Sequence, residues 1–419
     1  MTKPEQVAAE YHCPGERSPV SRAVHLGRLA RFYPACRRCP HAIDTGTHSA
    51  RLVKRLAETR RRGEPRPLFD DEGASGVYQN DLDPATATRM AAALGEYLRR
   101  ERSDEDDLPV VVIAGDGRPL TPELVAAVGE GLRWTGCHVV EIGAATAACV
   151  AFAVEHLHCG GGILVGNPAG EVHTVGLRFW GQGGQPLSAG GPLDDVREIF
   201  HAGVDRPARR YGSLRRFQAE VPYLAGMAES YHGLRPLRFV LDTTSRPLAG
   251  YLEKLTGPIP CDVLPCRVFS ERLADQVRED RAHFGVRVEE DGERCGLFDE
   301  QGRPVAAERF FLLVARHLLT GHPGAAIVLA EGQPAGLAGA IGGLGARVVF
   351  SEPRRSAMAR AMRENRAVFG GSPDGRFWFA SPEGHLAADA LMTITLLLRL
   401  LSQSDRRLSE VLDAEVPPR

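Results

Sequence analysis

Three acidic side chains at alternate positions could bind a cation in this 419-residue sequence. Glu289, Asp291 and Glu293 would point to one side of an extended segment, because successive side chains of a strand face opposite ways. Three carboxylates on one side suit a hard cation such as Mg²⁺. The same stretch, Glu-Glu-Asp-Gly-Glu between apolar runs, also fits an ordinary hairpin with an Asp-Gly turn. The sequence leaves both interpretations open.

A second group that could bind metal lies near the N-terminus. Cys36 and Cys39 form a Cys-x-x-Cys pair, and Cys13 supplies a third thiol. With a histidine, either His25 or His41, these residues predict one tetrahedral structural zinc site. Buried thiols without metal and an iron–sulfur cluster are the alternatives. A segment this short rarely folds on its apolar core alone, so a metal would supply needed stability.

The elements that would position these groups alternate between strand and helix. Short apolar, β-branched runs predict strands, and apolar residues at helical spacing predict the helices between them. The strand-like runs are 110–114, 138–142, 162–165, 237–242, 261–264, 326–329 and 346–350. The helical stretches are 122–135, 147–157, 248–255, 336–343 and 354–364. Repeated strand–helix–strand units predict an α/β protein with helix-covered sheets.

Composition narrows the function classes. The chain is 43% hydrophobic and 25% charged, with a formal net charge of −2, which is typical of soluble globular proteins. Its start has no apolar core of the kind a signal peptide needs, so we expect a cytoplasmic protein without membrane segments. Residues 1–67 hold 14 Lys and Arg against 6 Asp and Glu. A solvated surface explains this basic arm better than RNA binding, so nucleic acid is not expected as a partner.

Five segments, taken in order, resemble motifs of the α-D-phosphohexomutase superfamily, which includes phosphoglucomutases and phosphomannomutases. Residues 161–188 (GGILVGNPAGEVHTVGLRFWGQGGQPLS) are similar to GGIxITASHNPPxYNGxKxxxxxGxPxS, and residues 285–300 (GVRVEEDGERCGLFDE) to GxAxDGDADRxxxxDE. The other three segments are 69–83, 111–122 and 367–378. The resemblance runs without large gaps from about residue 68 to residue 412.

The resemblance implies three related α/β domains around a cleft. Domain I would span residues 68–203, domain II 212–297 and domain III 298–412. Residues 1–57, with the cysteines, have no counterpart in the family. The family's fourth domain, which binds phosphate, is expected to be absent.

The resemblance also implies that the mutase nucleophile has been lost. The family's TASHNPP falls on residues 166–172, so its phosphorylated serine corresponds to Pro168. Covalent catalysis needs a nucleophilic side chain, and proline has none. His173 and Thr174 are the nearest groups that could replace it.

Two further loops keep part of the family pattern. Glu289, Asp291, Glu293 and the adjacent Arg294 correspond to the metal loop, but two Asp→Glu changes add a methylene each, so magnesium would bind weakly. In the family's sugar-binding loop, the matching residues are Gly370, Gly371, Ser372, Asp374 and Arg376. The glycines match the family, whereas the side chains that hold sugar hydroxyls there differ.

These changes predict a non-catalytic homologue that binds a phosphosugar, or a protein partner through the N-terminal segment. In the first motif, family Ser and Arg positions are Glu72 and Ser75, which weakens phosphate binding further. The alternative is a divergent metal-dependent enzyme on hexose phosphates, either an intramolecular phosphotransferase or a phosphatase using metal-bound water.

Overall fold

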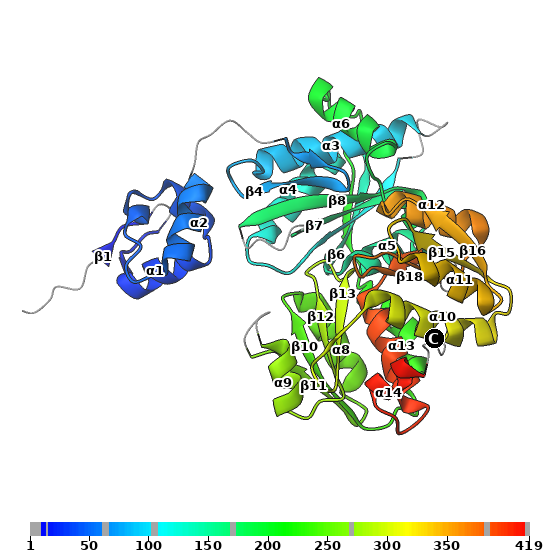
Figure 1. Ribbon diagram of the computed structural model, residues 1–419. Coiled ribbons are helices and arrows are strands. Elements are labelled where there is room, and N and C mark those ends of the chain that lie inside the picture. Colours follow the sequence, from blue (N-terminus) through cyan, green and yellow to red (C-terminus); the bar gives the residue numbers. More distant parts are fainter. Residues whose placement is uncertain are drawn as a thin grey trace, which may run out of the picture.

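Three α/β units and a small N-terminal module make up the computed structural model of this protein (Figure 1). The structure describes residues 10–13, 16–60, 67–101, 108–167, 173–267, 272–380 and 386–414. Within these ranges no helix combines the length and the apolar character that crossing a bilayer requires. The expected α/β class with three helix-covered sheets is confirmed.

The N-terminal module, residues 10–60, is built from short elements around one small core. Its elements are β1 (Glu10–Tyr11), β2 (Val20–Ser21), α1 (Arg22–Ala30), η1 (Pro34–Arg38), η2 (Pro40–Ile43) and α2 (Ala50–Arg60). Ser21 caps α1, because its hydroxyl accepts a hydrogen bond from the Val24 amide. The buried core consists of Tyr11, Cys13, Leu29, Phe32, Cys36, Cys39, Ala42 and Leu56.

Domain I contains a seven-stranded sheet in the order β3-β4-β8-β7-β5-β6-β9. Its strands are β3 (Phe69–Asp70), β4 (Gly73–Val77), β5 (Val110–Gly115), β6 (His138–Ala144), β7 (Gly161–Gly166), β8 (Thr174–Trp180) and β9 (Leu214–Arg216). Its helices are α3 (Pro84–Arg100), α4 (Thr121–Trp134), α5 (Ala147–His156), η3 (Gln182–Gly184) and α6 (Pro192–Ala202). Strand β9 lies beyond the expected end of this domain at residue 203, yet it pairs in parallel with β6.

Domain II contains a five-stranded sheet in the order β11-β10-β12-β13-β14. Its strands are β10 (Leu237–Thr243), β11 (Cys261–Pro265), β12 (Phe284–Val288), β13 (Cys295–Asp299) and β14 (Pro304–Val305). Its helices are α7 (Glu220–Ala228), η4 (Glu229–Tyr231), α8 (Arg246–Thr256) and α9 (Leu273–Glu279). The β12–β13 pair is antiparallel, so the acidic stretch between them forms a hairpin loop.

Domain III repeats this arrangement in the order β16-β15-β17-β18-β19. Its strands are β15 (Ala326–Ala330), β16 (Arg347–Ser351), β17 (Phe369–Gly371), β18 (Phe377–Ala380) and β19 (Leu386–Ala388). Its helices are α10 (Ala307–Gly321), α11 (Ala335–Gly343), α12 (Arg355–Asn365), α13 (Ala390–Ser402) and α14 (Leu408–Asp413).

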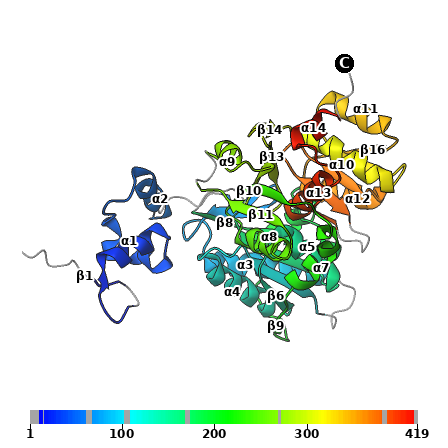
Figure 2. The ribbon, with the colours of Figure 1, turned by 90° about the horizontal axis from the view of Figure 1, so that it is seen from below.

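Helices α5 and α13 lie where the three domains meet (Figures 1 and 2). The Tyr231 hydroxyl of domain II lies 2.9 Å from the Thr395 hydroxyl on α13. One continuous apolar core contains buried residues of all three domains, including most of α5. The domains are therefore packed as one body around the hairpin loop of domain II.

Candidate functional site

The loop between β12 and β13 lies at this junction, and we call residues 289–294 the acidic loop. Its backbone is bonded to the other two domains. The Asp291 carbonyl accepts a hydrogen bond from the Ala147 amide at the start of α5, at 2.9 Å. The Gly292 carbonyl accepts one from the Ala390 amide at the start of α13, also at 2.9 Å. The first amides of a helix have no hydrogen-bond acceptor inside the helix. The two carbonyls of the acidic loop therefore accept from one such amide of α5 and one of α13.

Glu293 is the most enclosed carboxylate of the acidic loop, and two arginines of domain III neutralise it. Arg355 donates to its Oε1 from Nε at 2.9 Å and from Nη2 at 2.5 Å. Arg376 approaches the other oxygen at 3.3 Å. All three side chains are buried. Burial alone would raise the pKa of Glu293, but the two guanidinium groups outweigh burial and hold that pKa below its usual value.

The other two predicted magnesium ligands have different surroundings. Glu289 pairs with Arg294 of its own loop, with Oε2 and Nη1 3.0 Å apart. Burial raises the pKa of Asp291, and the charge of Glu293 raises it further. Among the described residues no three Asp, Glu, His or Cys side chains are grouped so that they could hold a metal ion. Glu289 and Glu293 are thus paired with arginines, whereas Asp291 accepts a hydrogen bond from the Glu293 amide at 3.0 Å. This arrangement gives the magnesium prediction no support.

The predicted ligand loop of domain III lies directly against the acidic loop. Asp374 Oδ2 accepts from Arg294 Nε at 3.0 Å and lies 3.1 Å from Arg376 Nη1. The amide of Cys295 donates to the Gly375 carbonyl. Ser372 is buried, and its hydroxyl has no partner within the described residues. Asp374 and Arg376, predicted to touch a ligand, therefore join domain II to domain III.

Packing explains why Gly370 and Gly371 of this loop are glycines. A Cβ added at Gly371 would lie 2.5 Å from the ring of Phe311, and one at Gly370 would lie 3.0 Å from the sulfur of Met362. Side chains at either position would displace the helices that cover β17. Their agreement with the family pattern does not by itself indicate a ligand.

Glu290 joins the acidic loop to domain I, and it was not among the residues predicted from the sequence. Its carboxylate accepts from Asn167 Nδ2 at 3.2 Å and from Thr244 Oγ1 at 3.3 Å, and lies 3.4 Å from Arg118 Nε. Burial raises the pKa of Glu290, although Arg118 acts in the opposite direction. The family motif quoted above has glycine at this position. The glutamate in place of that glycine was the feature of the sequence that could have identified Glu290.

The residue that corresponds to the family's serine, Pro168, lies outside the described residues, as do its neighbours to residue 172. The two groups considered as substitutes follow directly. Thr174 Oγ1 donates to Asn167 Oδ1 at 3.1 Å. His173 is buried, with its ring 6.4 Å from the ring of Phe32 in the N-terminal module.

Glu72, which replaces a family serine, binds the start of α12. One carboxylate oxygen accepts from the Arg355 amide and the other from the Ser188 hydroxyl, each at 3.0 Å. A carboxylate is favourable at a helix N-terminus, where the macrodipole is positive. Ser75 donates to Asp70. The acid that would repel phosphate has therefore become part of the contact between domains I and III.

The predicted zinc ligands are only partly brought together. Cys13 and Cys39 have their sulfurs 3.9 Å apart, and Cys36 is buried in the same core. His25 Nε2 lies 2.9 Å from the Asp44 carbonyl oxygen, and its ring stacks on Tyr11 at 4.2 Å. The His41 ring meets the edge of Tyr11 at 5.4 Å. The described part of the chain shows no group of three ligands, so zinc remains a prediction.

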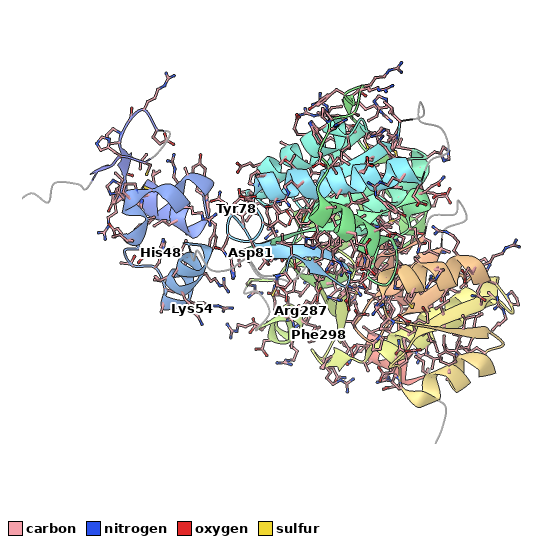
Figure 3. All side chains as sticks on the ribbon, turned by 90° about the horizontal axis from the view of Figure 1, so that it is seen from above. His48, Lys54, Tyr78, Asp81, Arg287 and Phe298 are labelled. Atoms are coloured by element: carbon pink, nitrogen blue, oxygen red, sulfur yellow. The ribbon has the colours of Figure 1, made fainter. Side chains whose placement is uncertain are left out.

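The N-terminal module faces domain I at His173 and Tyr78. Figure 3 shows His48 and Lys54 of the module on the side toward Tyr78 and Asp81 of domain I. A cavity of about 30 Å³ between them has an apolar lining from both partners. The module contributes Leu29, Phe32, Tyr33, Cys36, Arg37 and Leu56, and domain I contributes Tyr78, Gln79, Leu120 and His173.

Comparisons with known proteins agree with this architecture. Residues 66–201 match the family model of phosphoglucomutase/phosphomannomutase, alpha/beta/alpha domain I. A phosphoglucomutase/phosphomannomutase of Thermococcus kodakarensis is 26% identical over 84% of this chain and 80% of its own length. A phosphomannomutase of Salmonella typhimurium is 27% identical over 74% and 72%, respectively.

Solved structures show the same fold. A phosphoglucomutase/phosphomannomutase family protein of Burkholderia thailandensis superposes with a TM-score of 0.75 at 21% identity, covering 84% of this chain and 80% of that one. A putative phosphomannomutase of Thermus thermophilus gives 0.70 at 20% identity, covering 85% and 84%.

Proposed function

We propose that this chain, a member of the α-D-phosphohexomutase superfamily, is a non-catalytic homologue that does not interconvert hexose phosphates. The observation that supports this most directly is the pairing of buried Glu293 with Arg355 and Arg376. In the family motif this position is the third acid of the metal loop. A divalent cation would have to displace both arginines, leaving the buried charge of Arg355 without its ion-pair partner and that of Arg376 with Asp374 alone, which costs several kcal/mol.

The loss of the nucleophile is an independent argument from the sequence. Pro168 stands where the family has serine, and proline can neither accept nor return a phosphoryl group. Phosphoryl transfer depends on positioning and on positive charge around the transferred group. The family's serine position therefore offers no covalent acceptor, and the arginines beside the acidic loop are already paired with Glu293 and Asp374.

The role we propose is binding. Within the described residues, the buried donors beside the acidic loop that have no hydrogen-bond partner include Arg355 Nη1 and the Ser372 hydroxyl. Such donors would suit an oxygen-rich ligand, for which a phosphosugar is the natural candidate. The N-terminal module is the proposed contact for a protein partner, because Val24, Tyr33 and Ile43 expose large apolar side chains there.

Native mass spectrometry after incubation with glucose 1,6-bisphosphate and Mg²⁺ tests the catalytic part of the proposal. We expect no added phosphoryl mass, and no conversion of mannose 1-phosphate or glucose 1-phosphate in a coupled assay. A stable phosphoryl adduct would contradict the proposal, and mapping it would identify another nucleophile, with Thr174 and His173 examined first.

Pro168→Ser is the informative variant, because it restores only the hydroxyl. If the arginine pairs also prevent catalysis, Pro168→Ser stays inactive and takes up no phosphate. Turnover by this single variant would show that the acidic loop still works as a metal loop. The Thermococcus kodakarensis relative, assayed under the same conditions, serves as the positive control.

A further inference from the structure

An arginine-lined cavity lies on domain I, apart from the acidic loop. It has a volume of about 820 Å³. Five arginines line it, and we call this group the arginine basin: Arg99, Arg100, Arg206, Arg209 and Arg210. The remaining lining comes from Glu96, Leu108, Gly203, Val204, Asp205, Pro207 and Ala208. Figure 1 places α3 and α6, which flank the basin, on the side of domain I opposite domain II.

Among the lining residues that the structure describes, the basin has five arginines and two acids. Glu96 lies 3.5 Å from Arg99 and 2.9 Å from Arg100, so one carboxylate serves two arginines. Asp205 is the other acid of the lining. The described part of the chain supplies no ion-pair partner to the three arginines at positions 206, 209 and 210. The whole chain has a net charge of −2, so the basin is a local concentration of charge rather than an average property.

The segment that bears three of these arginines is fixed to the rest of domain I. Gly203 ends α6 with a left-handed backbone (φ 83°), and its amide donates to the Ile199 carbonyl. The Ala208 amide donates to the Trp134 carbonyl at 3.0 Å, and the Gly212 amide donates to the Arg133 carbonyl at 2.9 Å. The backbone between α6 and β9 is therefore held against the end of α4. Because folding holds the arginines close together, the cost of their mutual repulsion is met before any ligand arrives.

We propose that the arginine basin binds a small anion with two or more linked phosphate groups. Guanidinium groups match phosphate oxygens with paired hydrogen bonds. A single phosphate can contact only some of the five arginines, whereas a chain of two or three phosphates can reach several at once. The volume lies within the range of about 300–1,000 Å³ that small-ligand sites occupy.

Isothermal titration calorimetry of the full chain with inorganic tripolyphosphate tests this proposal. We expect tripolyphosphate to bind at least about tenfold more tightly than orthophosphate. Its affinity should fall as the salt concentration is raised from about 50 to about 200 mM. The variant Arg206→Gln/Arg209→Gln/Arg210→Gln should weaken binding about tenfold or more, since each exposed ion pair is worth up to about 1 kcal/mol.

The matched control is Arg31→Gln/Arg51→Gln/Arg272→Gln, which removes the same charge from exposed arginines outside the basin. It should retain the affinity of the parent. An equal loss of affinity for tripolyphosphate in both variants would show that only net charge matters and would overturn the proposal. The absence of tripolyphosphate binding at low salt would overturn it as well. Tighter binding of a ten-nucleotide single-stranded DNA than of tripolyphosphate would also overturn it, in favour of a nucleic-acid surface.

Discussion

Arg355 Nη2 lies 2.5 Å from Glu293 Oε1, and this buried pair joins helix α12 of domain III to the acidic loop of domain II. The guanidinium carbon of Arg355 also lies 4.8 Å from the ring centroid of Trp180 in domain I. One side chain thus contacts all three domains at the place where the family positions its metal. Burying a charge is costly unless it is paired, so this arrangement is stable only while the domains stay closed around it.

We therefore predict that Arg355→Met lowers the free energy of unfolding by about 3 kcal/mol, because it leaves Glu293 with Arg376 as its remaining partner in a buried site. Denaturant unfolding followed by tryptophan fluorescence measures this loss. The double variant Arg355→Met/Glu293→Leu should recover part of it, since the pair is removed together while buried Arg376 keeps Asp374 as its partner.

Arg354→Met is the matched control. Arg354 is the preceding residue and is partly exposed; it pairs with Glu352 at 3.7 Å and donates one neutral hydrogen bond to the Ala189 carbonyl of domain I at 3.2 Å. Arg354→Met should lower the free energy of unfolding by less than about 1 kcal/mol. If both single variants destabilise the protein equally, the buried pair has no special role in joining the domains.

The contact between the N-terminal module and domain I gives a second prediction. Phe32 is buried and faces His173, which follows the stretch containing Pro168. Phe32→Ala should loosen the module from domain I and speed hydrogen–deuterium exchange at residues 173–180. Val24→Ala, on the exposed side of α1, should leave exchange unchanged. Unchanged exchange in Phe32→Ala would contradict docking of the module on domain I.

The fold could be predicted from the sequence because its evidence is local. Apolar periodicity located the strands and helices, and motif order indicated three α/β domains. The expected end of domain I at residue 203 leaves out β9, and the expected end of domain II at residue 297 falls within β13 and leaves out β14, although β9 and β14 pair with the sheets of domains I and II. Both strands are too short, at three and two residues, to produce a recognisable pattern.

The site could be predicted only in part, because pairing partners are set by long-range packing. The acids of the acidic loop were identified, but Arg355, 62 residues away, gave no local indication that it would neutralise Glu293. An arginine at the start of a helix is ordinarily solvated. Glu290 was overlooked because the alternating pattern points its side chain away from the other acids, and toward Asn167 and Arg118.

The zinc hypothesis makes a prediction that does not depend on the acidic loop. If Cys13, Cys36 and Cys39 bind zinc, native mass spectrometry of protein prepared without chelator will show one zinc per chain. Cys13→Ser should remove it and destabilise the module, because metal binding would contribute folding energy there. Cys149→Ser, a buried thiol of α5, is the control and should keep the metal. A metal-free parent would leave the three thiols as core residues.

Asp389 makes stability depend on pH. It caps α13 by accepting from the Met392 amide, and it accepts from the Tyr223 hydroxyl at 2.7 Å. Burial raises the pKa of Asp389 to about 6, although these hydrogen bonds lower it, against 3.8 for an ordinary aspartate. The folded state therefore favours the protonated acid. This contribution is fully present below about pH 4 and is lost as the pH rises through 6.

Asp389→Asn keeps a capping side chain but cannot ionise, so it isolates this effect. Relative to the parent, the variant should gain stability between pH 4 and 7, by up to about 3 kcal/mol at 1.36 kcal/mol for each pKa unit. Urea unfolding at several pH values measures the difference. Asp83→Asn, the cap of α3 on domain I, is the control, because its carboxylate is only partly buried. A stability difference between Asp389→Asn and the parent that stays constant with pH would mean that Asp389 is already ionised at pH 4, and that the buried junction tolerates its charge.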